Sequence, residues 1–69
     1  MFGVEGEKVY QKVVRQMAKK GLRVEELAEK SDLSTNTIYR LNARKMILPV
    51  TIHKLAKALD LDSDIFFDN

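Results

Sequence analysis

The middle of the chain carries side chains that can form directed hydrogen bonds to a partner. Tyr39 and Arg40 follow Asn36 by three and four residues, so the three side chains share one face of a helix. Ile38 and Leu41 fall on the opposite face, which can therefore be buried in a core. An Asn amide and an Arg guanidinium are the groups that pair bidentately with adenine and guanine in the major groove of DNA. The pattern thus predicts a helix with one buried face and one hydrogen-bonding face.

The start of this helix is predicted at Ser34, because a serine hydroxyl readily accepts a hydrogen bond from an amide of the first turn. Leu33 and Ile38 have the spacing of a hydrophobic staple around that cap. Asp32 is a residue type that tolerates the left-handed conformation of a tight turn. A short amphipathic helix is predicted before the turn, from about Val24 to Lys30. Two helices joined by a tight turn are therefore expected over about residues 24–43.

Three further helices complete an all-α bundle of about five short helices, since no strand-like alternation is present. The first is predicted from about Glu5 to Lys20, with Gly21 as its C-terminal stop. Its apolar stripe is expected at Val9, Tyr10, Val13, Val14 and Met17. A connector over residues 44–50 is expected to end in Pro49. The fourth helix is then predicted to start near Thr51, with Ile52, Leu55, Ala56 and Leu59 facing the core. A last short helix is expected to start at Asp62 or Ser63.

Length and composition restrict the classes of protein. The 69 residues, 45% of them hydrophobic, predict one small domain over residues 1–69. A chain of this size buries only ~60% of its unfolded surface, which favours oligomerisation. The absence of cysteine excludes disulfides, thiolate catalysis and the usual zinc frameworks. No signal peptide is recognised, and the longest apolar stretch, residues 46–50, is too short to span a membrane, so a cytoplasmic protein is expected.

Charge is distributed unevenly along the sequence. Residues 33–59 contain five cations and no acid, whereas residues 60–69 contain four acids and no cation. The first 32 residues nearly balance, with seven basic and six acidic side chains. A basic middle that contains the hydrogen-bonding helix is typical of a protein with a polyanionic partner. Ordinary charge scatter on a solvated helical surface is the alternative.

A family resemblance rests on two runs of residues. Residues 21–38 read Gly-Leu-(x)4-Leu-Ala-(x)4-Leu-Ser-(x)2-Thr-Ile, and residues 55–61 read Leu-Ala-Lys-Ala-Leu-Asp-Leu. Together they resemble the helix-turn-helix and the fourth helix of small phage-repressor and Cro-type transcriptional regulators. The resemblance covers roughly residues 14–67 and implies a lambda-repressor-like domain that binds double-stranded DNA.

The resemblance suggests which side chains contact bases. Side chains in the first half of a helix lying in the major groove can reach base edges, and Thr35, Asn36, Tyr39 and Arg40 fit that requirement. In the family, the positions of Thr35, Asn36 and Arg40 commonly face bases. Arg40 could hold a phosphate instead, and the ring of Tyr39 could cover the edge of the core.

Phosphate contacts position such a protein without specifying sequence. The candidates are Thr37 near the start of the helix, Arg44 and Lys45 after its end, and the start of the fourth helix near Thr51. Lys54 is a further candidate, for which the alternative is an ordinary solvated position. Arg23 is the last candidate, at the start of the second helix.

Several positions depart from the family pattern. Val24 stands where the family usually has a phosphate-holding Gln, and Arg23 replaces the usual Ser or Thr cap, which predicts a weakly capped helix. Met17 and the run 42–44 replace an Arg and a Glu-x-Gly that often form a buried ion pair. Replacing both partners of such a pair is often neutral, whereas losing one is costly, so the double change is compatible with folding.

Dimerisation is expected because one module of this size makes few base contacts and relatives pair across palindromic sites. Ile65, Phe66 and Phe67, within a dimerisation end at residues 61–69, are the candidates for a homodimer interface. In the alternative, Phe66 packs on the first and fourth helices and Phe67 covers the rim. The apolar connector at residues 46–48 either tucks into the core or forms a partner surface.

Other functions have less support in the sequence. His53 is the only histidine and has no nucleophile beside it, and no glycine-rich phosphate loop or metal spacing is present, so no enzyme, cofactor or metal site is expected. No small-molecule site is evident, and no aromatic platform for single-stranded RNA is recognised. The serious alternative is a helix-turn-helix-fold module that binds another protein, an accessory or antagonist of another regulator. The sequence therefore favours a sequence-specific regulator that occupies operator DNA.

Overall fold

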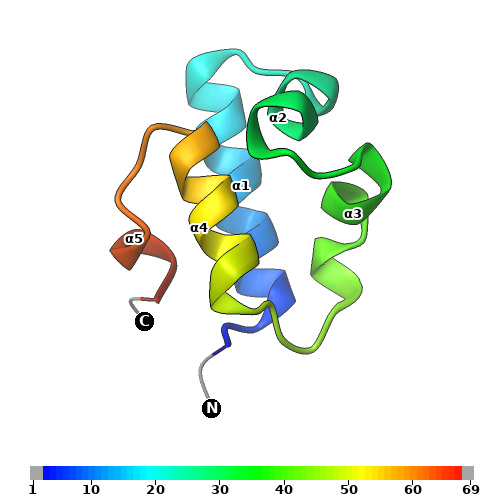
Figure 1. Ribbon diagram of the computed structural model, residues 1–69, viewed down its shortest axis with the longest axis vertical. Helices are drawn as coiled ribbons and strands as arrows, with labels where there is room; N and C mark the ends of the chain where they lie inside the picture. The colour runs from blue at the N-terminus through cyan, green and yellow to red at the C-terminus, as the bar shows by residue number, and fades with distance from the viewer. Residues whose placement is uncertain (1–2, 68–69) are drawn as a thin grey trace.

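Five α-helices and one 3₁₀ turn make up the regular structure of residues 3–67, the part of the chain that this computed structural model describes. The helices are α1 (Gly6–Lys20), α2 (Val24–Ser31), α3 (Thr35–Tyr39), α4 (Pro49–Ala58) and α5 (Asp64–Phe67), and the 3₁₀ turn η1 (Leu41–Ala43) follows α3 (Figure 1). The predicted all-α bundle is confirmed. None of the helices described is long and apolar enough to cross a membrane.

Three of the helices end in the same way. Gly21, Asp32 and Asp60 follow α1, α2 and α4 in the left-handed conformation, with φ of 66°, 60° and 58°. In each case the next residue donates its N–H to a carbonyl in the last turn of the helix, as Leu33 does to Ala28 at 3.1 Å. The left-handed turn predicted at Asp32 is thus confirmed, as is the stop at Gly21.

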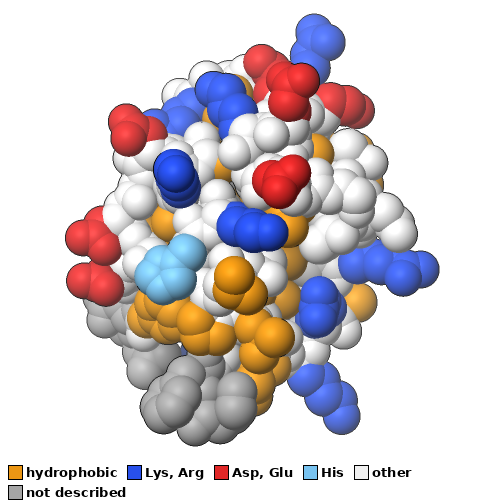
Figure 2. All heavy atoms as spheres, in the orientation of Figure 1, with side chains coloured by type: hydrophobic (Ala, Val, Ile, Leu, Met, Phe, Trp, Pro, Cys, Tyr) orange, Lys and Arg blue, Asp and Glu red, His pale blue; other side chains and the backbone are white. Residues whose placement is uncertain are grey.

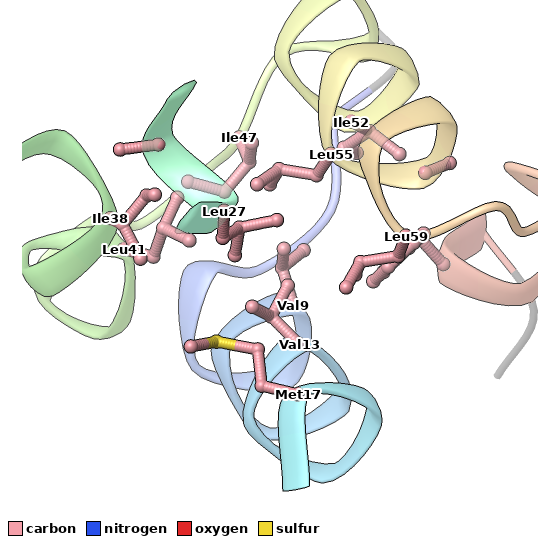
Figure 3. Close-up of a cluster of buried hydrophobic side chains, with 13 residues drawn as sticks. Val9, Val13, Met17, Leu27, Ile38, Leu41, Ile47, Ile52, Leu55 and Leu59 are labelled. Atoms are coloured by element: carbon pink, nitrogen blue, oxygen red, sulfur yellow. The ribbon is translucent and has the colours of Figure 1, made fainter. Parts of the chain in front are cut away.

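The hydrophobic core lies where α1, α2, α4 and the α3–η1 segment meet (Figure 3). Its buried side chains are Val9, Val13, Met17, Leu27, Ala28, Ile38, Leu41, Ile47, Ile52, Leu55, Ala56, Leu59 and Phe66. The core face predicted for the fourth helix is confirmed. Met17 lies in this core, so the position at which the family often carries a buried Arg is here apolar.

Two sequence-based predictions about helices were wrong. Val14 is 44% exposed, because Val9, Val13 and Met17 already form the buried stripe and Val14 projects about 100° around the helix from Val13. The fourth helix begins at Pro49 rather than near Thr51. Pro at the first helical position lacks only an N–H that would be unpaired there, so it starts the helix instead of ending the connector.

The helix expected to run through Ala43 is also shorter than predicted. α3 ends at Tyr39, and Arg40 has φ −92° and ψ 0°. The chain then tightens into η1, in which Ala43 and Arg44 donate to the carbonyls of Arg40 and Leu41 at 3.0 and 3.1 Å. Ala43 therefore does not continue the outer face of an α-helix.

The connector is divided between core and surface. Ile47 is buried and pairs with Val4 in an isolated antiparallel bridge, whereas Met46 and Leu48 are exposed. The alternative in which the connector tucks into the core is thus confirmed for Ile47, whereas a partner surface at Met46 and Leu48 stays a prediction. The bridge ties the N-terminal end of the described chain to the segment that follows η1, a long-range contact that no local sequence signal indicated.

Candidate functional site

The start of α3 is fixed by a side-chain cap. The Ser34 hydroxyl accepts a hydrogen bond from the Thr37 amide at 3.0 Å, and the Ser34 and Thr37 hydroxyls lie 2.8 Å apart. Ile38 is buried and Leu33 is partly buried against the same core, as the predicted staple requires. The predicted cap is confirmed, and it holds the first turn of α3 at the protein surface.

The outer face of α3 presents the predicted base-contacting side chains to solvent. Asn36 and Arg40 are exposed, and Thr35 is half-buried. Tyr39 is 57% exposed and is not among the side chains packed on the core, so its ring does not cover the core edge. The four positions therefore lie along one short surface formed by α3 and the residue that follows it.

Arg44 joins this surface although it lies beyond η1. Asn36, Thr37, Arg40 and Arg44 together line a hollow of about 260 Å³. We call residues 35–44 the recognition segment. Two guanidinium groups, an amide and a hydroxyl thus converge on one concave site, a donor-rich arrangement suited to phosphate and to the acceptor atoms of bases.

The charge around the recognition segment is mostly positive but not free of acids. The view in Figure 2 shows cations and no acids over α3 and the residues after it. Folding also brings Glu5 and Glu7 to a hollow that Arg44 and Lys45 line. The acid-free stretch of the sequence is therefore bordered in space by two carboxylates from the start of α1.

Arg23 lies in a different environment from the other predicted phosphate contacts. It lines a hollow with Glu25 and Glu26, and its backbone N–H donates to the Glu26 carboxylate at 2.9 Å. The Arg23 side chain does not cap α2, as predicted. The Glu26 side chain stabilises the helix start instead, through the bond that it accepts from the Arg23 amide. Two neighbouring carboxylates make Arg23 a weaker candidate for a phosphate contact than Arg44 or Lys45.

The start of α4 offers fewer free amides than expected. The Thr51 and Ile52 amides both donate to the Leu48 carbonyl, at 3.0 and 3.1 Å, and Pro49 has no amide proton. Only the Val50 amide and the half-buried Thr51 hydroxyl remain for a phosphate at this helix start. Lys54 is exposed one turn further along.

The C-terminal apolar residues do not share one environment. Phe66 is 1% exposed and belongs to the core, so it is not available on the surface for a homodimer. Ile65 and Phe67 are partly exposed, and the Phe67 ring lies 6.0 Å from the ring of His53 on α4. The Asp62 carboxylate accepts from the Asp64 amide at 3.0 Å, and α5 begins at Asp64, one or two residues later than predicted.

Comparison with known families accounts for this arrangement of helices. Residues 12–64 match the Cro/C1-type HTH DNA-binding domain, which covers more than half of the chain. The chain belongs to this family. It is a DNA-binding domain of the kind found in transcriptional regulators, and α2, the turn at Asp32 and α3 form its helix-turn-helix. The comparison with curated proteins gave no match.

In this Cro/C1-type domain, sequence reasoning missed the contacts that hold the end of the recognition segment. Gly6 is buried at the first position of α1 and donates its N–H to the Arg44 carbonyl at 3.1 Å. A signal was available, because Gly costs a helix about 1 kcal/mol relative to Ala and so suggests a close backbone approach where it occurs. The sequence does not indicate which backbone segment lies against Gly6.

Proposed function

We propose that the protein is a sequence-specific transcriptional regulator that binds operator DNA through the recognition segment. The observation that carries the proposal is the convergence of Asn36, Arg40 and Arg44 on one exposed hollow. Asn36 and Arg40 supply the groups that recognise adenine and guanine, with Thr35 and Tyr39 beside them. Thr37, Arg44 and Lys45 then hold phosphates on either side, and the start of α4 adds a further contact through Thr51 and Lys54.

We infer that this regulation works by occupancy of the operator. In this proposal the domain covers promoter DNA with its own bulk in the cytoplasm, without catalysis and without a cofactor. The amount of the protein, or a partner that binds it, sets how much operator is covered. Whether the result is repression or activation depends on where the operator lies relative to the promoter.

A single chain covers too little DNA for high specificity. The five residues of α3 span only about 7.5 Å along the helix axis. Base pairs are stacked ~3.4 Å apart, so this length faces two or three base pairs. A homodimer on a palindromic operator doubles the contacted sequence, with half-sites centred ~34 Å apart.

The homodimer surface that we propose is apolar and lies beside the C-terminal end. Val50, 60% exposed, and His53 share one face of α4, and Phe67, 37% exposed, lies against His53. Figure 2 shows hydrophobic side chains gathered next to this histidine, over the start of α4. Leu48 and Ile65 add exposed apolar area, which a twofold contact would bury.

Phe67→Asp tests this surface. A carboxylate placed in a buried apolar contact is strongly unfavourable, so we expect the dimer to dissociate to monomers at micromolar concentration in sedimentation velocity. Lys30→Asp, at an exposed position on α2, is the control and leaves the distribution unchanged. An unaltered dimer in the Phe67 variant would rule out this surface as the interface.

DNA binding is tested by fluorescence anisotropy with a duplex from upstream of the gene and a shuffled duplex of equal length, over a series of salt concentrations. We expect a preference for the native duplex and a steep loss of affinity with salt, because contacts with several phosphates release counterions that are condensed on the DNA. Absence of binding to either duplex at low salt would contradict the proposal.

The exposed apolar surface supports one second candidate, a module that binds another protein. Met46, Leu48 and Val50 are all exposed in a family in which DNA-binding surfaces are polar. An apolar interface with a protein responds little to salt, whereas DNA binding responds strongly. The same salt series therefore separates the two candidates.

A further inference from the structure

The end of the recognition segment has little structure of its own to hold it. After Tyr39 the chain makes a single 3₁₀ turn and then becomes extended at Arg44, with φ −88° and ψ 137°. Leu41 is the only buried side chain within η1. The direction in which the Arg44 side chain leaves the backbone must therefore be set from outside the segment.

Three backbone hydrogen bonds from the N-terminal part of the chain reach this region. Val4 and Ile47 exchange both of their bonds, at 3.1 and 2.7 Å, and the Gly6 amide donates to the Arg44 carbonyl at 3.1 Å. We call these contacts of residues 3–6 with residues 44–47 the N-terminal clasp. In this clasp, the Arg44 carbonyl accepts a hydrogen bond from an amide in the first turn of α1, the longest helix of the bundle. Amides at that position have no partner within the helix.

Gly6 permits the clasp because no larger residue fits there. A Cβ atom at Gly6 would lie closer than 3.0 Å to the carbonyl oxygens of both Leu41 and Arg44. Both obstacles are backbone atoms, so a rotamer change cannot relieve the overlap. Gly6 does not have a positive φ, so the close approach, and not an unusual conformation, is what requires glycine.

We propose that Gly6 is a positioning residue for DNA binding, which acts by fixing the Arg44 backbone and with it a phosphate contact at the end of the recognition segment. This inference rests on the proposed function, since Arg44 lines the DNA-facing hollow with Asn36 and Arg40. A methyl group at Gly6 displaces η1 and Arg44 outward while α3 keeps its cap at Ser34. The expected defect is therefore the loss of one phosphate contact and not the loss of the fold.

The test compares Gly6→Ala with Gly21→Ala in a salt series of DNA binding, at a temperature at which circular dichroism shows both variants folded. Gly21 has φ 66° and open space around it, so alanine there strains a helix end far from the recognition segment. We expect Gly6→Ala to reduce the slope of log affinity against log salt by about 0.9, the value for one phosphate contact. Relative to the wild type, the variant should therefore lose roughly eightfold more affinity at about 0.1 M salt than at about 1 M salt. Gly21→Ala destabilises the protein but keeps the wild-type slope.

A second comparison tests whether Gly6 acts through Arg44. In an Arg44→Ala background, Gly6→Ala should cause no further loss of affinity, because the contact that it positions is already absent. If Gly6→Ala does not fold, replacing the Gly6 residue by glycolic acid, which turns its amide into an ester, removes the hydrogen bond to the Arg44 carbonyl without adding atoms against η1.

The outcomes are distinct. A wild-type slope in a folded clasp variant, or additive losses with Arg44→Ala, would overturn the positioning role while leaving the proposed function intact. Failure of the wild-type protein to bind any duplex would instead contradict the proposed function itself.

Discussion

The two ends of the recognition segment are built by different means. At its start, the turn at Asp32 and the cap at Ser34 lie within a few residues of the helix that they position. At its end, the chain is held by Val4 and Gly6, about forty residues earlier in the sequence. The start of the segment is thus determined locally, and its end depends on the completed tertiary structure.

This difference suggests a division of roles between the two ends. Local caps contribute to whether α3 forms at all, since a five-residue helix has almost no stability in isolation. The N-terminal clasp instead holds the backbone at Arg44 and Ile47, after α3. We therefore expect changes at the start to alter mainly stability and changes at the end to alter mainly the DNA contacts.

The largest effect on stability is expected at Ile38, whose side chain lies in the core on which both ends of the recognition segment pack. Ile38 is buried, packs near Leu33 at the start and lies in the same core as Leu41 at the end. Ile38→Ala should lower the free energy of unfolding by ~2–5 kcal/mol, because it leaves a cavity in the core. A fall in Tm of at least about 8 °C is expected in thermal melts followed by circular dichroism.

Val14→Ala is the control for this prediction, because Val14 is 44% exposed on α1 and lies outside the core, so its truncation should change stability by less than ~0.5 kcal/mol. Equal melting temperatures of the two variants would show that Ile38 does not anchor the segment.

The next effect separates the two ends by the base pairs that they recognise. Asn36→Ala, near the start, and Arg40→Ala, near the end, should each remove ~1–3 kcal/mol of discrimination at one base pair, and at different base pairs. Binding to duplexes with single substitutions measures this, and Lys57→Ala, an exposed cation on α4, is the control. If the double variant kept the wild-type preference for every duplex, the base-contact assignment would be wrong.

The smallest effect isolates the start of the segment. Ser34→Ala should lower the free energy of unfolding by ~1 kcal/mol, because the Thr37 amide loses its acceptor, whereas Ser34→Gly should cost only a few tenths. Denaturant unfolding measures both values. Neither variant should change the salt slope of DNA binding at temperatures where it is folded, and a reduced slope would contradict the division of roles between the two ends.

The same contrast explains how much could be predicted from the sequence. The turn at Asp32, the cap at Ser34 and the stop at Gly21 were predicted because each depends on neighbouring residues and a known backbone conformation. The core face of α4 was predicted from helical periodicity alone. The residues proposed to contact bases came from the same periodicity together with the family resemblance, and their role is still a prediction.

What could not be predicted depends on tertiary contacts. The chain after α3 packs against α1 through η1, and Phe66 of α5 is buried in the shared core, and both are contacts with distant parts of the sequence. The hollow brings Arg44 beside Asn36, and the Arg44 carbonyl is held by the amide of the distant Gly6. Periodicity describes one helix at a time and carries no information about such distant partners.

DNA binding by the recognition segment is tested by titrating ¹⁵N-labelled protein with a DNA duplex at low salt and following the chemical shifts of the backbone amides. We expect the largest changes on the recognition segment, residues 35–44, and on Lys45 beside it. If the protein bound the duplex while these residues kept their shifts and the changes lay elsewhere, the recognition segment would not be the DNA-binding surface.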